Sequence, residues 1–232
     1  MVKTYFCSGI STNMSLYKLL FFLSISFYSC GYSQTTMQAN STAFKLSKKI
    51  NSLIIYIDNS DSCRKAVSIL DSATSIDSNC FSCYQNKVMF LYSLRQYTQA
   101  AVALDNCVRI KPYIIGNYIS DGLMHIKLGD TADAKKYFQR SLLICNSVLD
   151  TIKTNSSYYP AVAIDKAIVE IILDKRDEAN AVLKTFYNTE AGRLFKDDFI
   201  ILFNKSRNDI IDSLVNSEKY RHVQTGPVLK VP

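Results

Sequence analysis

Glycine, proline and histidine are scarce in this sequence, with 7, 4 and 2 residues among 232. So few glycines and prolines argue against an all-β sandwich, which needs many tight turns. The sequence also lacks a glycine-rich phosphate loop, an HExxH helix and a GxSxG elbow, and no acid/base or nucleophilic pair stands out. We therefore expect no enzymatic activity, no cofactor and no metal site.

A basic block interleaved with aromatic residues is also missing, although the formal net charge is +7. Two of the lysines, Lys3 and Lys18, lie in the first 33 residues, which contain no Asp or Glu. The remaining positive charge is spread along the chain, so nucleic acid is not an expected partner. A hydrophobic content of 48% with 20% charged residues is typical of a folded protein.

The longest apolar run near the N-terminus, residues 19–28, is short for a membrane span. A transmembrane helix needs about 20 apolar residues. A basic residue, Lys18, precedes the run and small residues follow it, which is the pattern of a secretory signal peptide over residues 1–33. Met14 stands where such peptides usually begin, so either Met1 or Met14 is the start. We expect an exported protein.

Two processing routes remain open at the end of this leader. Ser29-Cys30-Gly31 resembles a bacterial lipobox, which predicts lipidation of Cys30 and anchoring in the cell envelope, in the periplasm or at the outer membrane. Alternatively, Gly31-Tyr32-Ser33 offers small residues for ordinary cleavage, which would leave Gln34 first and the protein secreted. Residues 34–46 are polar and rich in Ser, Thr and Asn, and predict a flexible tether.

A repeat follows the tether. The alanines Ala66, Ala100 and Ala134 recur at a spacing of 34 residues. A large apolar residue follows each alanine by four positions and a small residue follows it by seven, namely Leu70, Leu104 and Phe138, and Ala73, Cys107 and Ser141. A period of this length predicts stacked helical hairpins that touch where side chains are small.

The pattern resembles the tetratricopeptide repeat, in which two antiparallel helices form a 34-residue unit. The resemblance implies an all-α fold, a right-handed superhelical array of hairpins. Its units would span 47–80, 81–114, 115–148 and 160–193, with an insertion of about eleven residues before the last. Gly122 and Ala134 would sit where two helices touch, and Gly129 would adopt a left-handed conformation at a turn. Residues 194–218 would form a helix that caps the array, and 219–232 a loose tail.

The resemblance places the first helix of each hairpin on a concave surface. The inward positions would be Gln85, Met89, Tyr92, Ile119, Leu123, Ile126, Ile164, Ile168 and Ile171. An exposed apolar groove predicts binding of an apolar or amphipathic peptide from a protein partner. Alternatively, the C-terminal helix folds back and fills the groove. The Lys/Asn set with which some family members clamp a C-terminal carboxylate is absent.

The cysteines and histidines give weaker signals. Cys80 and Cys83 form a C-x-x-C, but no second ligand pair completes a zinc site and no strand precedes it as in a thioredoxin. A bridge between Cys83 and Cys107 is conceivable within one hairpin, although Cys107 occupies a small packing position that suits a buried thiol. His125 takes the place of a large packing residue.

Taken together, these features predict a non-enzymatic interaction scaffold of the bacterial cell envelope. The competing hypothesis is a repeat scaffold that supports a solute-binding or enzymatic site. Such a site would need clustered polar residues in the insertion or the tail, and the sequence shows none there.

Overall fold

The computed structural model describes residues 42–156, 158–189, 202 and 204–216, and the regular structure among them is helical throughout. The all-α prediction is therefore confirmed for this part of the chain. The leader with Cys30, the first part of the tether and the tail lie outside the described residues. The helices are α2 (Thr42–Lys49), α3 (Asn51–Ile54), α4 (Ser60–Ile76), α5 (Phe81–Ser93), α6 (Tyr97–Ile110), α7 (Ile115–Lys127), α8 (Thr131–Leu149), α9 (Tyr159–Ile172), α10 (Arg176–Tyr187) and α13 (Arg207–Val215).

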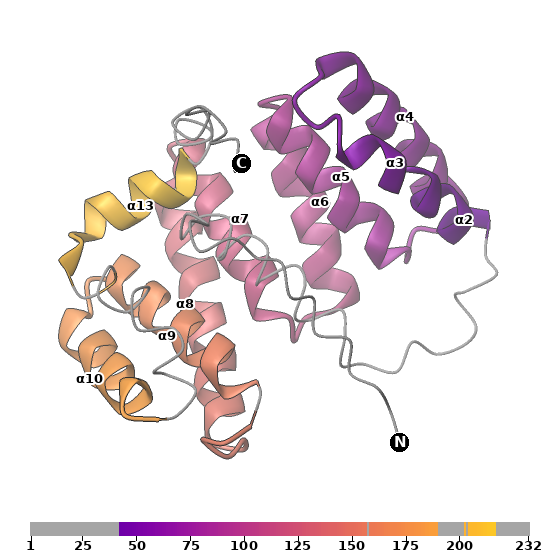
Figure 1. Ribbon diagram of the computed structural model, residues 1–232. Helices are drawn as coiled ribbons and strands as arrows, with labels where there is room; N and C mark the ends of the chain where they lie inside the picture. Colours follow the sequence, from indigo (N-terminus) through magenta and orange to yellow (C-terminus); the bar gives the residue numbers. More distant parts are fainter. Residues whose placement is uncertain (1–41, 157, 190–201, 203, 217–232) are drawn as a thin grey trace, which may run out of the picture.

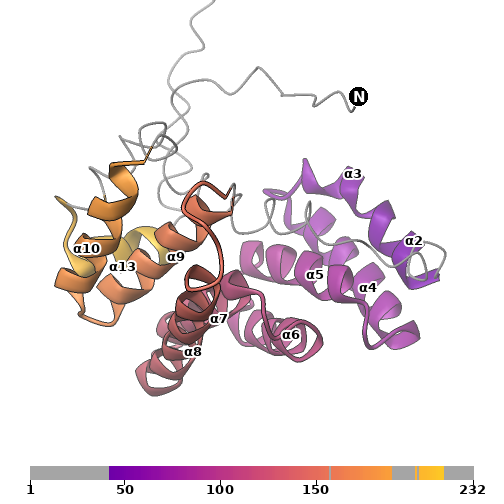
Figure 2. The same ribbon diagram turned by 90° about the horizontal axis from the view of Figure 1, so that it is seen from below.

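Successive helices from α4 to α10 pack side by side (Figure 1). We call α5–α6, α7–α8 and α9–α10 the second, third and fourth hairpins; α2, α3 and α4 precede them. Figure 2 shows that the hairpins follow one another along a curved path, with α13 returning beside the later ones. None of the described helices is both long and apolar enough to cross a membrane.

The three hairpins turn in the same way. Each turn has one residue with positive φ, which is Arg95 (59°), Gly129 (82°) or Asp174 (65°). The next residue donates its backbone N–H to a carbonyl five positions earlier, at 2.9, 2.9 and 2.8 Å respectively. This is the Schellman pattern that ends a helix. The left-handed conformation predicted at Gly129 is confirmed, and the same turn recurs 34 residues earlier and 45 later.

The small positions of the repeat lie in the core as predicted. Ala66, Ala100 and Ala134 are at most 2% exposed. A Cβ built at Gly122 would lie 2.8 Å from two ring atoms of Phe138, which is itself 2% exposed. The third hairpin therefore closes around a glycine because the facing phenyl ring occupies the space that a side chain would need.

The predicted tether is too long at its C-terminal end. Helix α2 begins at Thr42, inside the span 34–46, and residues 34–41 lie outside the described residues. Ala43 and Ser47, one helical turn apart, are buried against α4 and α5, with Ile50 close behind. The small size of Ala43 and Ser47 allows this close packing, and their polar neighbours hid it from a reading of hydrophobicity.

The predicted capping helix over 194–218 is also wrong as one continuous element. Residues 202 and 204 are helical, Lys205 and Ser206 interrupt the helix, and α13 starts anew at Arg207. Ser206 and Asp209 form a reciprocal capping box, in which the Ser206 hydroxyl accepts the Asp209 N–H at 3.1 Å. The capping box is a strong start signal, so α13 begins as a separate helix after Ser206.

Candidate functional site

The structure places the nine residues predicted for the groove on three first helices. α5 carries Gln85, Met89 and Tyr92, α7 carries Ile119, Leu123 and Ile126, and α9 carries Ile164, Ile168 and Ile171. None of the nine is exposed: Tyr92 and the three α9 isoleucines are buried, and the others are half-buried. The row is therefore largely covered.

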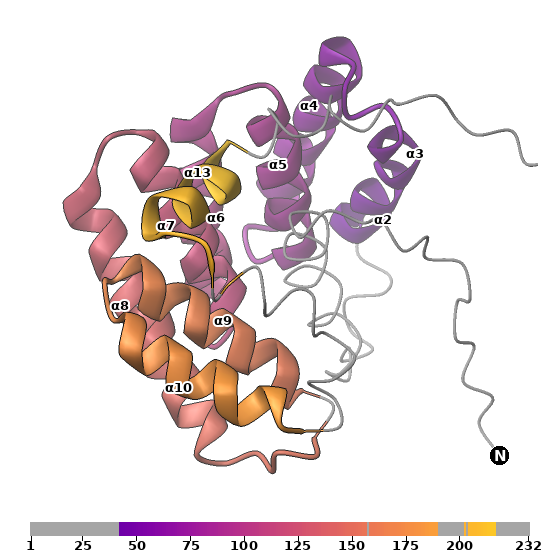
Figure 3. The same ribbon diagram turned by 60° about the vertical axis from the view of Figure 1, so that its left-hand side comes forward.

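Helix α13 covers the part of the row on α7 and α9, against which it packs (Figure 3). Ile210 of α13 is 3% exposed and belongs to the same apolar cluster as the three α9 isoleucines. The α7 residues Ile119, Leu123 and Ile126 also pack against that cluster. Over these two helices the arrangement matches the alternative interpretation, in which the C-terminal segment folds back.

Two side chains hold the C-terminal end of α13. The Tyr92 hydroxyl donates to the Val215 carbonyl at 2.8 Å, and Lys127 Nζ donates to the same oxygen at 2.9 Å. Lys127 also reaches Asn216 Oδ1 at 3.0 Å, and its ammonium lies 4.8 Å from the centre of the Tyr97 ring. The last carbonyls of a helix lack partners within it and carry partial negative charge, which a lysine satisfies well.

Two arginines hold the other end of the C-terminal segment. Arg176, the first residue of α10, donates to the carbonyls of Leu202 at 2.9 Å and Lys205 at 2.6 Å. In return, Arg207 Nε donates to the Ile172 carbonyl at the end of α9, at 2.7 Å. Sequence reasoning missed both arginines, because each satisfies the end of a helix that is distant in the sequence.

The α5 end of the row has different surroundings. Met89 packs with the cluster that joins α2, α4 and α5, and it is half-buried there. Asn86 Nδ2 donates to Ser47 Oγ at 3.1 Å, and Ser93 Oγ donates to the Ile57 carbonyl at 2.6 Å. The N-terminal segment is thus tied to the middle of α5 and to its last residue by side-chain hydrogen bonds.

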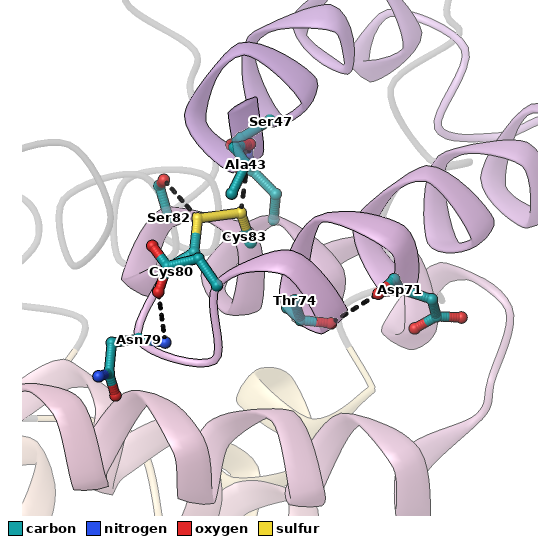
Figure 4. Close-up of a disulfide and its surroundings, with 10 residues drawn as sticks. Ala43, Ser47, Asp71, Thr74, Asn79, Cys80, Ser82 and Cys83 are labelled. Carbon is teal, nitrogen blue, oxygen red and sulfur yellow. Dashed lines mark hydrogen bonds between the residues drawn. A yellow bond between two sulfur atoms is a disulfide. The ribbon is translucent and has the colours of Figure 1, made fainter. Parts of the chain in front are cut away.

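The C-x-x-C motif is closed as a disulfide between Cys80 and Cys83 at the start of α5 (Figure 4). The conceivable bridge from Cys83 to Cys107 is therefore wrong, and Cys107 is a buried free thiol. Cys83 Sγ lies 3.7 Å from the Ala43 carbonyl of α2, whereas Cys107 packs with Phe81 and Ile114. The two sulfur atoms belong to different clusters, and the bridged pair lies under α2.

A group of polar side chains lies at the turn of the third hairpin. Asp121 on α7 is 0% exposed, and neither of its oxygens has a hydrogen-bond partner among the described residues. Its burial, and then the nearby Asp105 carboxylate, raise the pKa of Asp121 to about 8. The His125 ring stacks on Tyr137 at 5.1 Å between centroids, and Tyr137 Oη donates to Asp105 at 2.6 Å.

His125 is therefore the packing residue that its position predicted, but polar groups lie on both sides of its ring. Nε2 is 3.8 Å from Asp121 Oδ1, and Nδ1 is 3.6 Å from Asp130 Oδ2. The four-residue spacing of Asp121 and His125 could have indicated this pair in the sequence.

No family model matches the chain, and no curated protein matches it.

Proposed function

We propose that this chain is a non-enzymatic interaction scaffold whose first helices bind an amphipathic helix. The observation that supports the proposal best is the seat of α13 on α7 and α9. A short helix buries Ile210 and Val215 there, and two side chains of the array donate to the carbonyl of Val215, its last residue. These are the two components of helix-in-groove recognition: an apolar face sets the affinity, and polar contacts at the ends set register and direction.

In this proposal α13 is the intramolecular occupant of the groove, and a protein partner presents a helix of the same chemistry. The partner's helix would carry an Ile210-like apolar residue and end where Tyr92 and Lys127 receive its last carbonyls. The proposal also keeps the export expected from the leader, with lipidation at Cys30, so the partner would be a protein of the cell envelope. We propose tetratricopeptide-like repeats as the architecture, on the strength of the recurring turns at Arg95, Gly129 and Asp174.

The test is to release α13 in the full chain and offer its own sequence in trans. Replacing Ile210 with Asp puts a charge into an apolar contact, and loss of the isoleucine packing alone costs about 2–5 kcal/mol. Asn208→Asp makes the same new carboxylate at an exposed position of the same helix. The probe is a fluorescein-labelled peptide of residues 204–217, whose binding is measured by fluorescence anisotropy.

The peptide is expected to bind the Ile210→Asp chain and to bind neither the unchanged chain nor the Asn208→Asp chain. Adding Tyr92→Phe to Ile210→Asp should weaken peptide binding about fivefold to tenfold, because one hydrogen bond of about 1 kcal/mol is lost. Circular dichroism checks that the hairpins stay helical. If the released chain leaves the peptide unbound, or if all chains bind it equally, the groove is not a helix-binding site.

A further inference from the structure

Three potential ligand atoms meet at the turn of the third hairpin, from His125, Asp130 and Asp133, and all lie within 4.8 Å of one another. His125 is in the last turn of α7, Asp130 caps α8 and Asp133 is in the first turn of α8. His125 Nδ1 and Asp130 Oδ2 are 3.6 Å apart. Ligands about 2.1 Å from a tetrahedral Zn²⁺ lie about 3.4 Å apart, so this pair already has nearly the required separation.

Each carboxylate has one oxygen in use and one available. Asp130 Oδ1 accepts the Asp133 backbone N–H at 3.1 Å as the helix cap, which leaves Oδ2 towards His125. Asp133 Oδ1 accepts Lys136 Nζ at 2.5 Å, and the Lys136 side chain is 75% exposed. These two hydrogen bonds use one oxygen of each carboxylate, and the second Asp130 oxygen faces His125.

A second, independent feature is the buried Asp121 carboxylate behind the ring. Its side chain is 0% exposed, and neither of its oxygens makes a hydrogen bond of normal geometry among the described residues, although Tyr137 and Asp105 lie close to it. It lies 3.8 Å from His125 Nε2, on the opposite side of the ring from Asp130. Metal-binding histidines commonly donate their other N–H to a carboxylate, which fixes the tautomer and makes the ligand nitrogen more basic.

The His125 ring is also held in place by an aromatic ring stacked on its face. Tyr137 stacks on His125 with 22° between the ring planes, and its hydroxyl is held by Asp105. The imidazole thus has one nitrogen 3.8 Å from Asp121, the other 3.6 Å from Asp130, the N-cap of α8, and a ring plane stacked on Tyr137. Such preorganisation is characteristic of the residues around a metal ligand.

The fourth hairpin shows what the same positions look like when charges compensate one another. Forty-five residues after Asp121, His125, Asp130 and Asp133 the chain carries Lys166, Glu170, Lys175 and Glu178. There the signs alternate, and Lys166 Nζ lies 3.7 Å from Glu170 Oε1. In the third hairpin three of the four positions are acidic and the fourth is the histidine. None of these four positions carries a lysine or arginine, and the cation of the third hairpin is Lys136, which pairs with Asp133 Oδ1.

We propose that His125 Nδ1, Asp130 and Asp133 bind one divalent transition-metal ion of the Zn²⁺ type, with Asp121 as the positioning residue behind His125. One imidazole and two carboxylates suit Zn²⁺ and related ions, whereas Mg²⁺ prefers ligands made only of oxygen. A water molecule would complete four coordination. The site links the end of α7 to the start of α8, so the ion would fasten the hairpin turn.

The test uses the full chain with Zn²⁺ alone, by isothermal titration calorimetry, and Co²⁺ absorption as a spectroscopic readout. One Zn²⁺ per chain is expected, with loss of binding in His125→Gln and in Asp133→Asn. Asp130→Asn keeps a side chain that caps helices well, so its loss of binding would report the ligand and not the fold. Asp121→Asn should weaken affinity by roughly 10–100-fold without changing the stoichiometry.

Matched controls are available within the same chain. His222→Gln removes the only other histidine, and Glu178→Gln changes the equivalent carboxylate of the fourth hairpin. Both should bind Zn²⁺ like the unchanged chain, and the NMR signals of the His125 ring should shift on titration while those of His222 stay. The proposal is overturned if the unchanged chain binds no Zn²⁺, if His125→Gln binds it undiminished, or if excess Mg²⁺ displaces it.

Discussion

The third and fourth hairpins share one backbone arrangement but differ in the residues that pack between their helices and in their charged residues. Both turn through a residue of positive φ, Gly129 in one and Asp174 in the other. Where the third pairs Gly122 with Phe138, the fourth has Ala167 and Leu183 at the corresponding positions. A methyl group added to one helix is matched by a smaller side chain on the other. The comparison teaches that the repeat conserves the space between its helices and not the residues that fill it.

The electrostatic difference follows the same logic. In the fourth hairpin Glu170 is 4% exposed, with Lys166 one turn before it on the same helix. In the third, Asp121 is also buried, with the His125 ring 3.8 Å away and the Asp105 carboxylate nearby. The fourth hairpin thus places a lysine beside its buried carboxylate, whereas the third places an imidazole there.

The packing difference predicts the largest effect. Gly122→Val should destabilise the protein by about 1–3 kcal/mol, because the new side chain meets the buried Phe138 ring. Adding Phe138→Leu, which copies the residue of the fourth hairpin, should recover part of the loss. Urea unfolding of the two single variants and the double variant measures the coupling.

Ala167→Gly in the fourth hairpin is the control for helix propensity, and should cost about 1 kcal/mol through propensity with an added cavity contribution. If the effects of Gly122→Val and Phe138→Leu simply add, the two side chains do not share space. The volume argument for the third hairpin would then fail.

The turns predict a smaller difference. Gly129→Ala should cost about 1–2 kcal/mol, since a Cβ is unfavourable at positive φ even where no atom lies nearby. Asp174→Gly should change stability by less than about 0.5 kcal/mol, because aspartate tolerates this conformation and glycine loosens the unfolded chain. Thermal unfolding of both variants tests the pair. Equal losses at the two turns would show that their φ values do not determine the cost.

The hairpins were predictable because helix crossings restrict side-chain size, so Ala66, Ala100 and Ala134 recur at a fixed interval. The sequence assigned the nine predicted groove residues to three first helices, but it did not show what covers them. The seat of α13 depends on contacts such as Tyr92 to Val215, which join residues 123 positions apart. No local pattern carries such a contact.

The polar group at the third turn was missed for a related reason. From the sequence, Asp130 is an ordinary helix cap and His125 is a packing residue. Each interpretation describes one contact correctly, the Asp130 cap on Asp133 and the stacking of His125 on Tyr137. Only the turn brings α7 and α8 together so that the two side chains and Asp121 meet. The pairing of Cys83 with Cys107 was wrong because periodicity placed both near the same hairpin but gave no direction for either sulfur.

The charge difference predicts the smallest effect and a dependence on pH. Burial raises the pKa of Glu170, while Lys166 opposes the shift. The folded chain therefore holds a proton in a pH range where the unfolded chain, with an ordinary glutamate near 4.3, has released it. Stability from this group is full at low pH and declines as pH rises through the folded-state pKa.

Glu170→Gln should remove that decline and raise stability at neutral pH by up to about 1 kcal/mol. The loss of the ion pair with Lys166 reduces this gain. Glu178→Gln should change the pH profile much less, because Glu178 is exposed and raises the pKa of Glu170 less than burial does. Urea unfolding between pH 4 and 8 measures both. A profile of Glu170→Gln that still falls as steeply as that of the unchanged chain would mean that Lys166 keeps Glu170 ionised throughout. In that case the Lys166–Glu170 ion pair alone would balance the buried charge of the fourth hairpin.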